Sequence, residues 1–140
     1  MRRLREADLI LHAGDFVSLR ALEELRSLGP VEAVHGNADE LAVRVELPAQ
    51  QVVEAGGVRI AMVHDAGPAA GREERLALRF SGCDAVVYGH THVAQIARVE
   101  GALWILNPGS PTERRRAPAR TMLVLEIADG RIVPELVTLS

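Results

Sequence analysis

Apolar and polar residues follow two different spacings along the chain, and each spacing predicts one kind of element. Short apolar runs bounded by Gly, Pro or Asp are typical of strands. Such runs lie within residues 9–13, 31–37, 50–65, 83–90, 102–110 and 120–139. The two longest runs predict hairpins, because turn residues interrupt them at Gly56-Gly57 and at Asp129-Gly130.

Two other segments carry hydrophobic residues at the spacing of a helix. Leucines recur at every third position over residues 19–28, between Ser18 as a candidate N-cap and Gly29 as a stop. Further along, Leu76 and Phe80 stand four residues apart and predict a second helix. The order mixes β-α-β units with later hairpins, which predicts an α/β fold with a mixed sheet, or two sheets packed face to face.

Composition adds limits of size, charge and location. The 140 residues suffice for one core, so we expect a single domain over residues 1–140. The formal net charge is −3 and all 16 basic residues are Arg, which gives no signal for nucleic acid or a membrane surface. No apolar run approaches the roughly 20 residues of a membrane span. The single cysteine, Cys83, cannot form an internal disulfide, so a cytoplasmic location is expected.

Polar side chains follow five of the predicted strands at the point where each strand ends. These residues are Asp15, Asn37, His64, His90, His92 and Asn107. Because the carboxyl ends of parallel strands share one rim of an open α/β sheet, we expect these side chains to gather there. A single such ending means little, because a turn or a packing role is the common alternative for each of these residues.

The donor types at this rim favour a hydrolytic metal site. Imidazole suits Zn, Fe, Ni, Co or Mn, while carboxylate and amide oxygens favour harder ions. A mixed nitrogen and oxygen set without thiolate argues against structural zinc and against iron–sulfur centres. Two such ions about 3.5–4 Å apart can clamp a phosphate and lower the pKa of a bound water.

Five short motifs come in a fixed order along the chain. They are GD at 14–15, GNAD at 36–39, VH at 63–64, GHTH at 89–92 and NPGSPT at 107–112. This order resembles that of calcineurin-like metallophosphoesterases, in particular the small bacterial and archaeal phosphodiesterase branch. The resemblance implies a four-layer α/β/β/α sandwich of two mixed sheets with a two-metal centre.

The resemblance also implies a ligand set, carried over by position. Asp15 would bridge the two metals. Asn37, His64 and His90 would complete one site, and His92 would serve the other. Two divalent ions per chain are expected, with manganese favoured and nickel, iron, cobalt or zinc as alternatives.

Two departures from the family pattern bear on activity. The family opens with a strand ending in Asp-x-His, which supplies two ligands to the metal that His92 serves, and no such motif precedes Asp15. The resemblance therefore implies either that the start of the chain is placed too far downstream or that the protein lacks the family's first strand. Two metals per chain or only one are the corresponding alternatives. Ala38 stands where the larger family often has an acid His, which the small phosphodiesterase branch also lacks.

Four further polar residues receive weaker assignments. Ser110 and Arg114 are candidates for binding substrate, because Arg matches phosphate oxygens bidentately. The alternative for Ser110 is a role in shaping the loop, and the alternative for Arg114 is a solvated run of charges. Asp39 and Asn107 are candidates for orienting a metal ligand by a hydrogen bond, or for capping and shaping turns.

These motifs together predict a divalent-metal-dependent phosphodiesterase that hydrolyses phosphoester bonds through a metal-activated water, with no side chain assigned as the nucleophile. The expected partner is a small phosphodiester; nucleic acid and membrane are not expected, and a homo-oligomer is an alternative to a monomer. The competing hypothesis is a catalytically impaired paralogue or a protein-binding scaffold with the same fold, which the absent Asp-x-His favours. The retained metal-type residues argue against it, because a binding surface has no physical need of them.

Overall fold

The computed structural model describes residues 8–12, 19–27, 29–36, 41–89, 91, 94–99, 103–109 and 120–139. The helices in these ranges are α2 (Leu19–Arg26), α3 (Leu41–Glu46) and α4 (Arg72–Arg79). The strands are β1 (Ile10–His12), β2 (Val31–Ala33), β3 (Gln50–Ala55), β4 (Val58–Val63), β5 (Ala85–Tyr88), β6 (Gln95–Val99), β7 (Leu103–Asn107), β8 (Arg120–Ala128) and β9 (Arg131–Leu139). None of these helices has the length and apolar character that crossing a bilayer requires.

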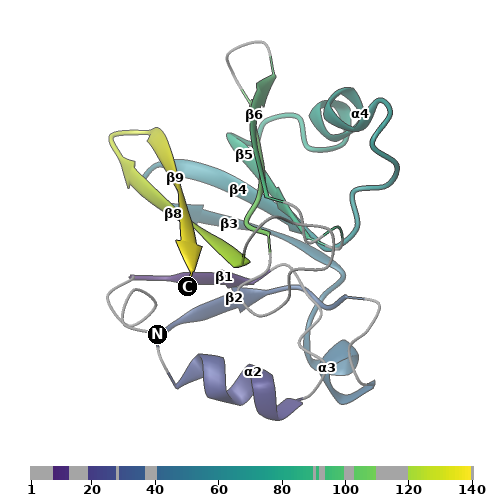
Figure 1. Ribbon diagram of the computed structural model, residues 1–140, viewed down its shortest axis with the longest axis vertical. Helices are drawn as coiled ribbons and strands as arrows, with labels where there is room; N and C mark the ends of the chain where they lie inside the picture. The colour runs from purple at the N-terminus through teal and green to yellow at the C-terminus, as the bar shows by residue number, and fades with distance from the viewer. Residues whose placement is uncertain are drawn as a thin grey trace.

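A five-stranded mixed sheet, in the order β3-β4-β5-β7-β6, forms the centre of the described structure (Figure 1). Strands β4, β5 and β7 are parallel neighbours, and β3 and β6 run antiparallel at the two edges. β4 and β5 consist mostly of buried Val, Ile, Ala and Met, as expected of parallel strands that are covered on both faces. Because β4, β5 and β7 are parallel, their carboxyl ends lie at one rim of the sheet.

Two smaller sheets make up the rest of the described strands. β1 pairs in parallel with β2, and β8 pairs with β9 as an antiparallel hairpin. Asp129 and Gly130 both have positive φ and form the predicted two-residue turn of that hairpin. The predicted α/β class with a mixed sheet is therefore confirmed. The sandwich of two mixed sheets is not confirmed in that detail, because these described strands form separate two-stranded sheets.

Different elements cover the two faces of the five-stranded sheet. One face packs against β1, β8 and β9 in a cluster that contains Met62 and Ile132. The opposite face packs against α4, chiefly through Leu76. Helices α2 and α3 lie next to β1 and β2, where Leu22 and Val43 form a third cluster (Figure 1). The buried apolar residues of the described structure therefore form three clusters, one on each face of the central sheet and one beside α2 and α3.

The predicted strands and helices correspond to observed elements wherever the structure describes them, but α3 and β6 have no counterpart in the sequence prediction. α3 has six residues, including β-branched Val43 and Val45, and is too short to show a helical period. It is stabilised instead by the burial of Val43 and Leu47 against Leu22 of α2. The first half-buried position of β6 is the polar Gln95. The alternation of apolar and polar residues that indicates a strand is therefore weak in this segment.

Candidate metal centre

The carboxyl ends of β4 and β5 join two of the sequence motifs. His64 directly follows β4, and Gly89, the first residue of GHTH, directly follows β5. The strands are in register up to the pair Val63 and Tyr88, and the Gly89 N–H donates to the His64 carbonyl over 2.9 Å. The chain segment that leads into His90 therefore starts beside the backbone of His64.

His64 is the one predicted metal ligand that lies within the described residues. It is 4% exposed, and its ring Nε2 atom is buried. A neutral imidazole nitrogen is a common ligand of Mn, Fe, Co, Ni and Zn, and it loses less hydration on burial than a charged group. The donor chemistry and the position of His64 therefore fit a divalent ion at this rim.

Asn107, at the end of β7, holds the segment between the two GHTH histidines. It is fully buried, with 0% exposure. Its amide Nδ2 donates to the Thr91 hydroxyl over 3.0 Å and to the Gly89 carbonyl over 3.4 Å. Its Oδ1 accepts from the Gly109 N–H over 2.9 Å. The side-chain amide is thus bonded to protein on both sides, which suits a role in shaping the loop.

Replacing Asn107 with alanine should destabilise the protein by about 1–3 kcal/mol, because partly buried groups at Gly89, Thr91 and Gly109 each lose a hydrogen bond. Asn107→Asp is the matched variant, since it keeps the acceptor for Gly109 and loses only the donor side. Denaturation in urea measures the free energy of unfolding of both variants. A stability of Asn107→Ala equal to that of the wild type would contradict this account of the loop.

The remaining predicted site residues lie outside the described residues. They are Asp15, Asn37, Asp39, His90, His92, Ser110 and Arg114. The strands that precede the first two end next to each other, because β1 and β2 are parallel and the Val34 N–H donates to the His12 carbonyl over 3.1 Å. Within the described ranges, no three His, Cys, Asp or Glu side chains form a group that could hold a metal ion.

His35 lies two residues before Asn37 and has a polar atom without a partner among the described residues. Its backbone N–H donates to the Pro48 carbonyl over 3.0 Å, but its ring Nδ1 is buried and makes no hydrogen bond there. A buried nitrogen left in this state costs about 1–3 kcal/mol. His35 is therefore a further candidate for contact with a bound group.

A polar network beside GHTH was not predicted from the sequence. The Arg72 Nη1 donates to the Tyr88 hydroxyl over 3.1 Å, and that hydroxyl donates to the Gln95 side chain. The Gln95 Nε2 in turn donates to the Glu73 carboxylate over 3.0 Å. The available signal was Tyr88 itself, the only Tyr of the sequence, at the end of an apolar run just before Gly89.

Comparisons with known proteins agree with the motif order. The sequence model of the calcineurin-like phosphoesterase superfamily domain matches residues 1–130. A probable metallophosphoesterase of Methanothermobacter thermautotrophicus is 36% identical over 137 residues, which cover 95% of this chain and 77% of that protein.

Two solved structures share the fold over nearly the whole chain. The solution structure of a Thermotoga maritima protein has a TM-score of 0.73 and 31% identity, and the match covers 98% of this chain and 84% of that one. Wild-type Vps29 from Entamoeba histolytica, complexed with Zn²⁺, has a TM-score of 0.75 and 27% identity, over 98% of this chain and 86% of that one. On the strength of the domain match and the archaeal relative, this chain belongs to the calcineurin-like phosphoesterase superfamily.

Proposed function

We propose that the protein is a divalent-metal-dependent phosphodiesterase that acts on a small phosphodiester. The observation that carries the proposal is the buried His64, whose carbonyl accepts the Gly89 N–H of GHTH, in a chain of a phosphoesterase family. The ligand set is the one expected from the motifs, namely Asp15, Asn37, His64, His90 and His92. When bound, divalent ions in such a site neutralise phosphate charge and make a water molecule more acidic.

Contacts among the described residues support this ligand set. His64 offers an imidazole nitrogen at the end of β4, while Asn107 bonds to Gly89 and Thr91 on either side of His90. Side chains held by hydrogen bonds and packing keep ligands within the narrow tolerance that metal sites need. The proposal includes manganese as the favoured ion. It also includes a reducing, cytoplasmic location, since Cys83 is a free thiol.

Removal of metal tests this function directly. Protein stripped of metal with EDTA should lose its hydrolysis of bis(4-nitrophenyl) phosphate. Added Mn²⁺ should restore more of this activity than Zn²⁺, Ni²⁺ or Co²⁺. Mass spectrometry of the metal content then separates two ions per chain from one. A chain that retains no ion and cleaves neither this diester nor 4-nitrophenyl phosphate would refute the proposal.

The competing function is a protein-binding scaffold or an impaired paralogue with this fold. Two exposed apolar side chains favour it: Leu41 is 77% exposed and Val45 is 78% exposed, one helical turn apart on α3. Exposed apolar residues grouped in this way are suited to contact with another protein. Metal binding without turnover, in the assay above, is the result that would select this function.

A further inference from the structure

The loop that leads from His64 to α4 is held by two arginine side chains of that helix. Arg75 donates to the carbonyls of Ala66 over 2.9 Å, Pro68 over 2.7 Å and Ala70 over 2.9 Å. Arg72 donates to the Gly67 carbonyl through Nη2 over 2.9 Å and through Nε over 3.3 Å. The carbonyls that α4 fixes therefore lie two to six positions after His64 in the chain.

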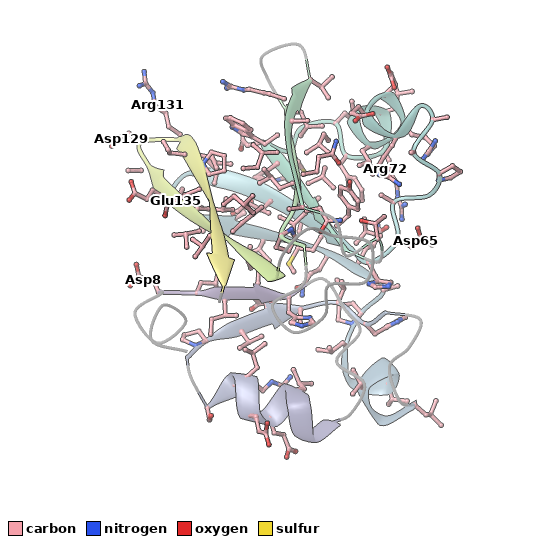
Figure 2. The ribbon with its side chains drawn as sticks, in the orientation of Figure 1. Asp8, Asp65, Arg72, Asp129, Arg131 and Glu135 are labelled. Carbon is pink, nitrogen blue, oxygen red and sulfur yellow. The ribbon has the colours of Figure 1, made fainter. Side chains whose placement is uncertain are left out.

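Arg72 also reaches the strand that leads into GHTH. Its Nη1 donates to the hydroxyl of Tyr88, and its guanidinium lies 5.0 Å from the centre of the Tyr88 ring. Tyr88 is only 2% exposed. Figure 2 shows Arg72 and Asp65 on the side of the molecule that carries α4, away from the β8–β9 turn at Asp129. One guanidinium thus bonds to the segments that follow β4 and end β5.

The Tyr88 hydroxyl extends this connection across the GHTH segment. It donates to Gln95, the first residue of β6, and Gln95 donates to Glu73 of α4. Tyr88 and Gln95 lie just before Gly89 and shortly after His92 in the sequence. The two ends of the segment that carries the predicted histidine ligands are therefore tied to each other and to α4.

We propose that Arg72 is a positioning residue that sets the spacing between the His64 loop and the GHTH segment. The inference rests on the proposed metal-dependent function. Arginine suits this task because its planar group carries five donors in a fixed fork, so it serves two acceptors in different directions at once. A lysine ammonium keeps the charge but lacks that fork, and it cannot reproduce both sets of bonds in the same geometry.

The expected consequence is a loss of metal affinity in Arg72→Lys. A group that hydrogen-bonds to a metal ligand is typically worth about 10–100-fold in metal affinity. The bonds of Arg72 run to Gly67 and Tyr88, which flank the predicted ligands, so we expect a loss of Mn²⁺ affinity at the lower end of this range, about 10-fold. Tyr88→Phe keeps the ring under the guanidinium and removes only the hydroxyl, so its loss should be smaller. The double variant should lose less Mn²⁺ affinity than the two single losses combined, because both changes break the bond between Arg72 and Tyr88.

The measurement is calorimetric titration of metal-free protein with Mn²⁺, together with the electron paramagnetic resonance spectrum of the bound ion. A change in the spectrum reports altered ligand geometry, which a merely structural role of Arg72 would not produce. Arg79→Ala is the matched control on the same helix, because Arg79 lies over the Phe80 ring at 5.1 Å and bonds to Gln50 instead. It should bind Mn²⁺ as the wild type does.

The outcomes separate this inference from the function on which it rests. Wild-type protein that binds none of Mn²⁺, Fe²⁺, Co²⁺, Ni²⁺ and Zn²⁺ removes the proposed function, and the positioning role with it. If the wild type binds Mn²⁺ and Arg72→Lys binds it with equal affinity and an unchanged spectrum, the positioning role alone is overturned. Should Arg72→Lys fail to fold, Tyr88→Phe decides in the same way, since wild-type affinity in that variant contradicts the proposed link.

Discussion

Replacing His64 with alanine should reduce metal-dependent phosphodiester hydrolysis by more than about 100-fold, because loss of a direct ligand should exceed the 10–100-fold effect of an outer partner. The imidazole lies at the end of β4, and His64 is 4% exposed. Bulk water therefore has little access to the position that the imidazole would leave. The checks are steady-state kinetics with an aryl phosphodiester and the metal content of the purified variant.

The neighbouring residue provides the control for this experiment. Asp65 is exposed, and its Oδ1 accepts the Gly67 N–H over 2.8 Å, a bond that Asp65→Asn retains. Asp65→Asn should therefore keep both metal and activity. If Asp65→Asn instead loses activity while His64→Ala keeps it, and the circular dichroism spectra are unchanged, the assignment of His64 as a ligand is wrong.

Leu76→Ala should destabilise the protein by about 2–5 kcal/mol, because it removes a side chain that is 1% exposed between α4 and the central sheet. Leu78 lies on the same helix but is 82% exposed, and Leu78→Ala should change the free energy of unfolding by no more than about 0.5 kcal/mol. Denaturation in urea compares the two. Equal effects at both positions would mean that α4 does not pack as described.

The sequence predicted the class of fold well where a pattern was long or bounded by a specific turn. The β8–β9 hairpin is an example, because Asp129-Gly130 separates two runs of β-branched and apolar residues. The prediction failed for α3, whose six residues are ordered by contact with α2 and not by their own propensity. Such tertiary stabilisation leaves no period in the sequence.

The sequence predicts the ligand types of the candidate site, but it does not predict the side chains that hold the neighbouring segments in place. His64 and Asn107 stood out because each polar residue ends an apolar run, and both lie buried at the ends of parallel strands. Arg72 and Gln95 gave no such signal. Each is an ordinary surface-type residue in the sequence, and each becomes part of the site only through contacts between segments far apart in the chain.

The contacts of Arg75 restrict what the loop after His64 can tolerate. Gly67 has φ of +80°, a backbone conformation that L side chains rarely adopt, and a Cβ placed there would lie 2.9 Å from the Arg75 Nη2. The guanidinium can move aside only by releasing the carbonyls of Ala66 and Pro68. Positions 67 and 75 are therefore coupled, and an engineer who wants a side chain on this turn has to redesign both as a pair.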